Sequence, residues 1–209
     1  MNYLFGNKKL NQTLQKIISY KDMANDILIA GGVSIYINDN MINSKRRHHD
    51  FDFYVDIKNM PKIRTYMKEL GATFLKDTLS HFDDDLGCDI IINDIKVELI
   101  PYQLKNNTIY VDRAYYNEGN DNWTFYRSGI LKLLPIKEIF EKIKMYNNIE
   151  VKVMKKDFSY ALKYYLYKYE NIKRNKDKKD IAYLKNIINL DKAKKLVKLF
   201  IDKKVITKA

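Results

Sequence analysis

Two aspartates at alternate positions, Asp50 and Asp52, begin the apolar segment DFDFYVDI, and a third acid, Glu98, lies within a second apolar segment, IKVELIPY. Alternate side chains of a strand project to the same face, so the two aspartates would face one way and Phe51 and Phe53 the other. A buried carboxylate without a partner is costly. A divalent metal ion is the most economical partner, and a set of oxygen ligands suits Mg²⁺ or Mn²⁺ rather than zinc. The three acids are therefore predicted metal ligands, able to hold a pair of ions.

A glycine pair precedes these acids, where the apolar run ILIA ends in Gly31-Gly32 and Ser34 follows. A Gly-Gly turn lets the backbone approach an anion closely, and the serine hydroxyl with a following helix N-terminus can hold phosphate oxygens. A phosphate cradle beside metal-binding acids predicts phosphoryl or nucleotidyl transfer. Each feature alone also has a structural interpretation. Gly-Gly occurs in many turns, Asp-x-Asp can be a solvent-facing strand edge, and Glu98 can pair with a lysine.

A basic run, KRRHH, leads directly into Asp50. We interpret Arg46 and His48 as groups that approach a triphosphate or hydrogen-bond to the acids, and Arg47 and His49 as parts of an exposed loop. A zinc site built from the two histidines is disfavoured because adjacent residues of a strand point apart and no cysteine is near.

Composition limits the class of protein. The chain has 209 residues, of which 46% are hydrophobic, and a single cysteine, Cys88. It is long enough for one domain or for one domain with a smaller appendage, and it cannot form an intramolecular disulfide. The sequence shows no uninterrupted apolar signal region and no segment of membrane-spanning length. We expect a soluble, cytoplasmic protein without a membrane partner.

The net charge of +12 is unevenly distributed. Residues 1–140 contain 18 Lys/Arg and 18 Asp/Glu, whereas residues 141–209 contain 20 and 8. Such asymmetry favours an anionic partner for the last third of the chain, such as nucleic acid or nucleotide phosphates. A solvated, lysine-rich helical face explains it equally well.

The elements that must position the acids can be read from periodicity. Helices are expected over residues 10–20 and 60–70, a short helix beginning near Ser34, and strands over 26–30 and 51–57. The segments GCDIIIN and IKVELIPY, joined by Asn93-Asp94, form a hairpin candidate. Residues 108–116 and 123–128 add possible strands. The expected fold is α/β (α+β), with a mixed sheet flanked by helices.

From Pro135 onward the pattern is interpreted as helical throughout, ending in a C-terminal helical bundle. Apolar residues recur at helical spacing from Phe158 to Ile172, a second helix begins near Asp180, and a third covers 191–205. Two domains are therefore predicted, residues 1–135 and a basic helical domain, 136–209. Tyr165 and Tyr169 are assigned to the core, which leaves Tyr164, Tyr167 and Lys168 as possible acceptor contacts.

The order of these motifs resembles the nucleotidyltransferase superfamily related to DNA polymerase β. Its signature, a Gly-Gly/Ser-x-Ser/Thr turn, then Asp-hydrophobic-Asp on the next strand and a later third acid, is matched by the Gly31, Asp50 and Glu98 motifs. The run RRHHDFD resembles lincosamide-type antibiotic nucleotidyltransferases. In the later half, RNKDKKDIAYL resembles the Lys-Asp-x-x-Asp motif of AbiEii-like enzymes, which include toxins of toxin–antitoxin pairs; the matching residues are Lys176, Asp177 and Asp180.

The resemblance implies specific roles. Asp50 and Asp52 would bind two Mg²⁺ (or Mn²⁺) ions, Glu98 would help deprotonate the acceptor hydroxyl, and Lys176 would contact the nucleoside triphosphate (NTP) across the cleft. Asp177 and Asp180 would belong to the same nucleotide-binding motif. The sequence departs from the commoner pattern by having Glu98 in place of aspartate, and KKDF at Lys155–Phe158 is a competing match that lacks the second acid.

The leading hypothesis is an enzyme that moves a nucleoside monophosphate (NMP) from an NTP to a hydroxyl or phosphate acceptor. The acceptor is an RNA 3′ end, a protein side chain or a small molecule such as an antibiotic, and the basic helices favour a macromolecule. In the toxin interpretation a protein antitoxin is a further partner. The alternatives are an antibiotic-modifying nucleotidyltransferase, a catalytically silent nucleotide- or nucleic-acid-binding regulator, and a two-metal nuclease.

Overall fold

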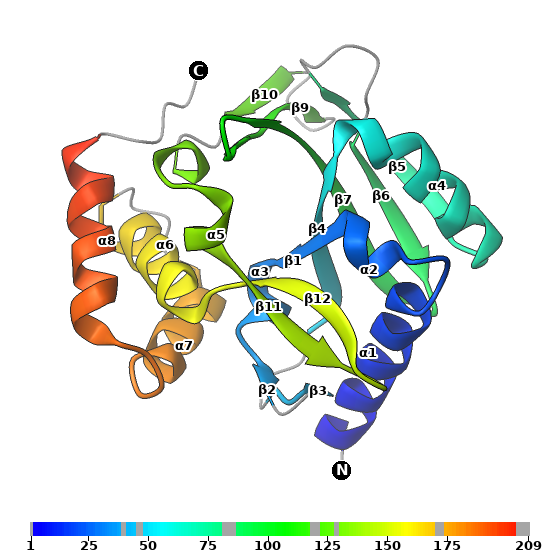
Figure 1. Cartoon of the computed structure of the whole chain (residues 1–209), viewed down its shortest axis with the longest axis horizontal. Coiled ribbons are helices and arrows are strands. Elements are labelled where there is room, and N and C mark those ends of the chain that lie inside the picture. Colours follow the sequence, from blue (N-terminus) through cyan, green and yellow to red (C-terminus); the bar gives the residue numbers. More distant parts are fainter. Residues whose placement is uncertain are drawn as a thin grey trace.

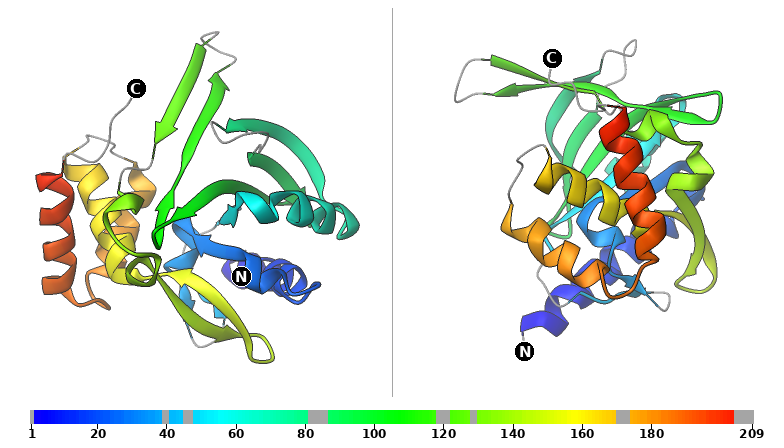
Figure 2. Two further views of the ribbon diagram at one scale, coloured as in Figure 1. Left: turned by 45° about the horizontal axis from the view of Figure 1, so that its top comes forward. Right: turned by 90° about the vertical axis from the view of Figure 1, so that its left-hand side faces the viewer.

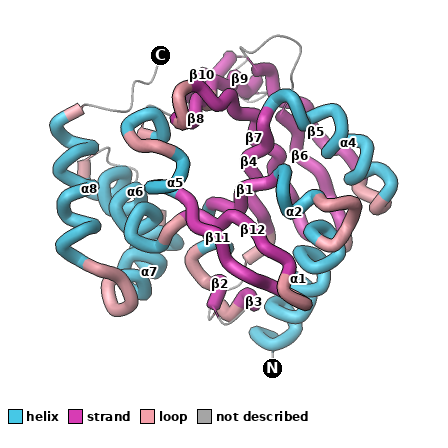
Figure 3. Tube along the Cα trace, in the orientation of Figure 1, coloured by secondary structure: helices cyan, strands magenta, loops and turns pink. Residues whose placement is uncertain are grey.

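One mixed β-sheet lies at the centre of the molecule, with helices around it (Figures 1 and 3). The computed structural model describes residues 2–38, 41–44, 48–80, 87–117, 122–127, 130–169 and 174–203. In this part the sheet runs in the order β10-β9-β5-β6-β7-β4-β1-β12-β11, with β8 beside β7. Its strands are β1 (Ile27–Ala30), β4 (Asp50–Asp56), β5 (Thr73–Ser80), β6 (Gly87–Ile92), β7 (Ile95–Lys105), β8 (Thr108–Tyr110), β9 (Asp112–Asn117), β10 (Asn122–Arg127), β11 (Phe140–Met145) and β12 (Ile149–Met154).

The helices divide between the two faces of this sheet (Figure 2). They are α1 (Asn2–Ile18), α2 (Met23–Asp26), α3 (Gly31–Ser34), α4 (Met60–Glu69), α5 (Ile136–Ile139), α6 (Lys156–Lys168), α7 (Asn175–Leu184) and α8 (Leu190–Asp202). A small separate ribbon pairs β2 (Ile37–Asn38) with β3 (Met41–Ile42). No helix of the described segments is long and apolar enough to cross a bilayer.

Strand alternation at the centre of the sheet separates two apolar layers from each other. Phe51 and Phe53 of β4 are fully buried in a core that also contains apolar residues of α1 and α4, as the sequence predicted. Tyr54 of the same strand lies in the second core, with Phe158 of α6 and Phe200 of α8. Asp50 and Asp52 have the same parity as Tyr54, so they face the layer of α6 and α8 rather than that of α1 and α4.

Strand pairing at this centre brings the acids together. β1 runs antiparallel to β4 and parallel to β12. β4 and β7 are parallel. In this register Asp52 lies opposite Ala30 on one side and Glu98 on the other.

Several sequence predictions are confirmed. Strands β6 and β7 form the expected hairpin, in which Asn93 and Asp94 both have positive φ, as a two-residue turn requires. Helix α4 has Pro61 in its first turn and is followed by Gly71, with φ +82°. The fold is α/β, a mixed sheet flanked by helices and followed by a C-terminal helical bundle.

The expectation of helix throughout residues 136–154 is wrong. After the single turn of α5, β11 and β12 form a hairpin that joins the sheet beside β1. Val151 and Val153 are buried while Glu150 and Lys152 are not, which is the period of a strand. Three left-handed residues, Tyr146, Asn147 and Asn148, make the turn. The division into domains at residue 135 stays a prediction.

Three smaller differences concern helix boundaries and the core. The helix expected to begin near Ser34 instead ends there, and α7 begins at Asn175, before the expected start near Asp180. Tyr165 is buried as expected, whereas Tyr169 is 51% exposed because α6 ends at Lys168.

Candidate active site

The candidate site is centred on Asp52, which lies between two neighbouring strands that both contribute to the site. Its backbone pairs with Ala30 at the end of β1 and with Glu98 in β7. Residues paired in register have side chains on the same face of the sheet, so the carboxylates of Asp52 and Glu98 lie side by side. Asp50 pairs in the same way with Lys96. The three predicted acids, from β4 and β7, thus lie on one face of two neighbouring strands.

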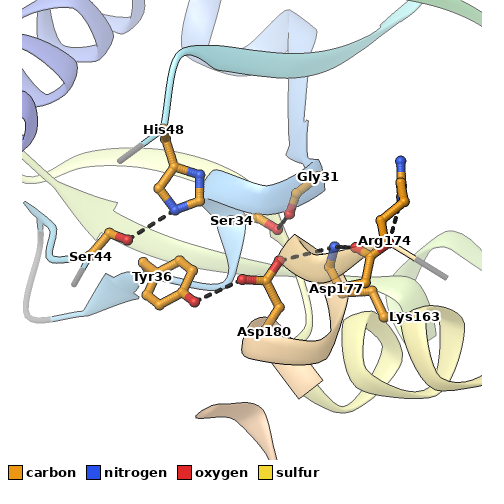
Figure 4. Close-up of polar contacts among 9 residues, drawn as sticks. All are labelled: Gly31, Ser34, Tyr36, Ser44, His48, Lys163, Arg174, Asp177 and Asp180. Carbon is orange, nitrogen blue, oxygen red and sulfur yellow. Dashed lines mark hydrogen bonds and ion pairs between the residues drawn. The ribbon is translucent and has the colours of Figure 1, made fainter. Parts of the chain in front are cut away.

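Gly31 allows the chain to pass directly over Asp52. It has φ +67°, a conformation that residues with a Cβ adopt only with strain. A Cβ built on Gly31 would lie 1.6 Å from Oδ2 of Asp52. The Ser34 hydroxyl donates a hydrogen bond of 2.8 Å to the Gly31 carbonyl, which closes this turn (Figure 4). The glycine is therefore required by both its φ and its contact with the acid.

The protonation of Asp52 reflects its crowded surroundings. Burial, followed by the negative charges of Glu98 and Asp50, raises the pKa of Asp52 to about 7, although the positive charges of Lys176 and Lys163 act in the opposite direction. Carboxylates brought together in a poorly solvated place cannot all ionise at little cost. A bound cation would remove this conflict.

A cavity of about 260 Å³ opens above Asp52 and Glu98, between the sheet and helix α6. One side is the sheet and the other is α6 with the residue that precedes α7. The lining residues are Ala30, Gly31, Asp52, Tyr54, Glu98, Ile100, Met154, Ser159, Leu162, Lys163, Leu166 and Arg174. The cavity thus combines two acids, two cations and an apolar surface.

Lys163 is held in the wall by two buried acids of α7 (Figure 4). Its Nζ lies 2.6 Å from Oδ1 of Asp177 and 3.1 Å from Oδ2 of Asp180. The Tyr36 hydroxyl donates a 2.8 Å hydrogen bond to Asp180, and Arg174 Nε lies 2.5 Å from Asp177. Burial alone would raise the pKa of Asp177, but the hydrogen bonds and charges of Lys163 and Arg174 hold it below its usual value. The network therefore holds Lys163 and Arg174 beside the cavity through ion pairs with the acids of α7.

The predicted residues of the Lys-Asp-x-x-Asp motif occupy different positions relative to this cavity. Asp177 and Asp180 are buried behind its wall and are not among its lining residues. Lys176 is exposed, and its positive charge opposes the rise in the pKa of Asp52. Direct contact of these three residues with a nucleotide stays a prediction.

Sequence reasoning missed the cavity residues Ser159, Lys163 and Arg174. All three occur in a segment rich in lysine and polar residues, where no local motif distinguishes one from another. Only the contact with Asp177, fourteen residues further along the chain from Lys163, singles Lys163 out. The two aspartates that the motif did identify point to it.

The basic run before Asp50 is only partly described. His48 is buried, at 3% exposure; its Nε2 hydrogen-bonds to the Ser44 hydroxyl at 2.9 Å, and its ring packs against Tyr36 at a centroid distance of 5.1 Å. Because the Tyr36 hydroxyl also donates to Asp180, His48 packs against one member of the network that holds Lys163. Arg46 and Arg47 lie outside the described residues.

The donor set fits a hard divalent cation. Asp50, Asp52 and Glu98 offer only carboxylate oxygens, which Mg²⁺ and Mn²⁺ prefer. Burial, and then the negative charges of Glu98 and Asp50, raise the pKa of Asp52, and a bound cation would act in the opposite direction. Within the described residues, no three His, Cys, Asp or Glu side chains already form a metal-binding cluster. Metal binding by these acids stays a prediction.

Comparisons with known proteins agree on the fold. The sequence matches no protein-family model and no curated protein. The solution structure of the antibiotic-resistance factor ANT(2'')-Ia matches with a TM-score of 0.62 and 13% identity, over 95% of this chain and 94% of that one. The crystal structure of ANT(2'')-Ia in complex with adenylyl-2''-tobramycin gives 0.62 and 14%, over 92% and 97%.

A lincomycin-bound crystal structure of the lincosamide antibiotic adenylyltransferase LnuA also matches, with a TM-score of 0.48 and 13% identity over 84% of this chain and 92% of that one. At such identities the likeness to ANT(2'')-Ia concerns the fold, which is of the nucleotidyltransferase type. The AbiEii-like part of the resemblance stays a prediction.

Proposed function

We propose that this protein is a nucleotidyltransferase that moves an NMP from an NTP to an acceptor and releases pyrophosphate, with Mg²⁺ or Mn²⁺ as cofactor. One observation carries the proposal: Asp52 and Glu98, paired in register on parallel strands, form the floor of a cavity whose opposite wall presents Lys163 and Arg174. Acids for metal and cations for phosphate face each other across a space open to substrate.

The acids would hold the cofactor. Asp50 and Asp52 project to one face of β4, and Glu98 joins them from β7. A divalent ion bound there supplies charge neutralisation at the phosphates and lowers the pKa of a bound hydroxyl. Gly31 contributes by leaving the space in which the Asp52 carboxylate lies.

The cations would hold the triphosphate. Lys163 and Arg174 line the cavity, and Lys176 adds a charge that acts on Asp52. Charge-assisted hydrogen bonds from such groups to phosphate oxygens are about twice as strong as neutral ones. Because Asp177 and Asp180 fix Lys163, the phosphates would meet a preorganised donor. Gly32, Ser34, Arg46 and His48 are kept as further candidates for nucleotide contacts.

In the reaction, the acceptor oxygen attacks the α-phosphorus of the NTP and forms a new P–O bond. The bond from the α-phosphorus to its bridging oxygen breaks, and pyrophosphate leaves with that electron pair. Glu98 accepts the proton of the acceptor hydroxyl. Lys163, Lys176 and Arg174 stabilise the negative charge that develops on the departing pyrophosphate.

Two acceptor classes follow from different observations. RNA is supported by the basic last third of the chain, where α7 and α8 expose Lys178, Lys179, Lys194, Lys195 and Lys198. An enzyme of that type would act as the toxin of a toxin–antitoxin pair, with an antitoxin protein as partner. A hydroxyl-bearing antibiotic is supported by the fold shared with ANT(2'')-Ia, which was solved with adenylyl-2''-tobramycin.

The test is incubation of the protein with Mg²⁺ and each of the four NTPs labelled at the α-phosphate, with total RNA, tobramycin or lincomycin as acceptor. We expect label in one acceptor class and an equal amount of pyrophosphate. The metal is worth several kcal/mol to such a reaction, and each 1.4 kcal/mol is a factor of ten, so Asp52→Asn should reduce transfer about 10³-fold.

The same assay separates the alternatives. Nucleotide binding with no transfer to any acceptor would identify a silent regulator instead. Shortening of the RNA without incorporation of label would identify a nuclease.

A further inference from the structure

The hydroxyl of Ser159 is buried at the cavity without an internal partner. Ser159 is 3% exposed and lines the cavity, and its Oγ has no hydrogen-bond partner among the described residues. A helical serine can bond to the carbonyl four residues earlier, yet here the carbonyl of Lys155 accepts the backbone N–H of Ser159 and not its hydroxyl. Because a buried unpaired hydroxyl is costly, Ser159 points to a ligand that pairs with it.

Ser159 belongs to one stripe of helix α6. Ser159, Leu162, Lys163 and Leu166 are spaced i, i+3, i+4 and i+7, and all four line the cavity. Such residues share one face of a helix. The wall therefore offers one hydroxyl and two apolar side chains beside the cation that we assign to phosphate.

The floor opposite this stripe changes character along the strands. Tyr54 and Ile100 lie two residues beyond Asp52 and Glu98 on the same faces of β4 and β7, roughly 6.6 Å further along. Both are buried in the second core, as is Met154 of β12, which also lines the cavity. One end of the cavity is thus ionic and the other apolar.

We propose that the apolar end is the nucleoside subsite, in which the base packs against Tyr54, Ile100 and Leu162 and the Ser159 hydroxyl hydrogen-bonds to the base or the ribose. This proposal rests on the proposed function and assigns the wall that recognises the nucleotide. The cavity lining changes from ionic near Lys163 to apolar near Tyr54, and a single molecule with an anionic end and a flat, weakly polar end matches both parts. An acceptor molecule carries no triphosphate, so it would not require the cations that adjoin this end of the cavity.

Equilibrium binding tests the assignment without turnover. Calorimetry would measure Mg²⁺ complexes of ATP, GTP, CTP and UTP, and of inorganic tripolyphosphate, which has the anionic end but no nucleoside. In Ser159→Ala, we expect the tightest NTP to bind two- to tenfold more weakly, as the loss of one neutral hydrogen bond implies, with tripolyphosphate binding unchanged. In Lys176→Met, a change at an exposed residue, both ligands should bind more weakly.

Two controls separate binding from folding. Thr65→Ala removes a helix hydroxyl that does bond to the carbonyl four residues back, at 3.1 Å to Pro61, and lies on α4; it should leave both affinities unchanged. Ser159→Ala should not lower the melting temperature, since alanine favours helix and the variant has no unpaired hydroxyl. A lower melting temperature would indicate a structural role and overturn the proposal.

The remaining outcomes are distinct. If Ser159→Ala binds the NTP as tightly as the wild type, or weakens tripolyphosphate equally, the nucleoside assignment is wrong while the proposed function survives. If the wild-type protein binds neither NTP nor tripolyphosphate, both proposals are wrong.

Discussion

At the scale of single residues, Asp52 is an acid whose charged form is disfavoured by its surroundings. It lies under Gly31 and beside Glu98, and these neighbours together with burial raise its pKa to about 7. A folded protein that keeps a proton which the unfolded chain has lost becomes less stable as the pH rises. The metal-free protein therefore has a built-in destabilisation that a bound cation would relieve.

This conflict predicts a pH dependence. Between the ordinary value of 3.8 and about 7 the folded state binds the extra proton, so the free energy of unfolding should fall across that interval. Each pH unit is worth about 1.4 kcal/mol. Asp52→Asn should remove this decline, so that its stability relative to the wild type rises by about 3 kcal/mol between pH 5 and pH 8, measured by urea unfolding in a chelator.

The matched control is Asp94→Asn. A hydrogen bond from Lys9 lowers the pKa of Asp94, so its titration lies below pH 5 and the difference from wild type should stay constant between pH 5 and pH 8. A stability difference for Asp52→Asn that is equally constant would show that Asp52 is ionised throughout.

Sequence reasoning identified residues by different means at this scale. Asp50, Asp52 and Glu98 could be found because acids in apolar strands violate an expected pattern. Lys163 could not be identified in this way, because one lysine among the many of residues 141–209 departs from no expected pattern. Its identity as a cavity residue depends on Asp177 and Asp180, which reach it from another helix.

At the scale of elements, the turn from β1 into α3 is the part least tolerant of change. Gly31 and Gly71 both have positive φ, but a Cβ on Gly31 meets Asp52 at 1.6 Å, whereas one on Gly71 meets nothing within 4 Å. Gly71→Ala is therefore a control for backbone strain alone, about 1–2 kcal/mol.

Gly31→Ala should cost at least as much stability as Gly71→Ala and, in addition, displace the Asp52 carboxylate. A misplacement of about 1 Å at reacting groups can reduce rates about 10²-fold, so we expect a loss of transfer of at least that size in Gly31→Ala and none in Gly71→Ala. Steady-state assays and urea unfolding of both variants check this. Equal transfer by the two variants would contradict the close approach of backbone and acid.

Helices α6 and α7 depend on one buried cation. The Lys163 side chain is 12% exposed and those of Asp177 and Asp180 are 2% and 0% exposed. Removing one partner of a buried ion pair typically costs about 3–5 kcal/mol, so Lys163→Met should lower the free energy of unfolding by that amount.

The comparison is Lys194→Met, whose partner Asp191 lies at 3.5 Å with both side chains largely exposed. Exposed pairs contribute less than about 1 kcal/mol. Similar stabilities of the two lysine variants in urea unfolding would show that the buried network does not tie α6 to α7.

The β11–β12 hairpin shows why element prediction failed in one place. The strand IEVKVM alternates apolar and charged residues over most of its length, whereas FEKIKM has two adjacent charged residues, and the lysines of both continue the composition of the helices that follow. The period of two was present locally. The position of β12 beside β1 could not be predicted from local sequence, because these parallel strands are separated by more than a hundred residues.

At the scale of the whole molecule, the sheet and the helical bundle form one site rather than two separate parts. The cavity takes its floor from β1, β4 and β7 and its wall from α6. Behind that wall, the hydroxyl of Tyr36, which follows α3, hydrogen-bonds to Asp180 of α7. The uneven distribution of charge could be counted from the sequence. The packing of the basic helices against the strands that carry the acids could be seen only in the structure.

This arrangement predicts the behaviour of the fragment 1–135. It lacks β12, which pairs with β1, and lacks Met145, Val151 and Val153 of the main core. We expect it to be unfolded or loosely packed, with poor dispersion in a ¹H–¹⁵N NMR spectrum, while the full chain gives a dispersed spectrum. A well-dispersed spectrum of the fragment would support the domain boundary at residue 135 instead.

The measurement that tests the site most directly is a crystal structure with a non-hydrolysable NTP analogue and Mn²⁺, whose anomalous signal locates the metal. We predict a manganese peak between the carboxylates of Asp52 and Glu98, with the triphosphate reaching Lys163, and loss of the peak in Asp52→Asn. An analogue bound elsewhere, or bound in the cavity with no metal at these acids, would contradict the proposed site.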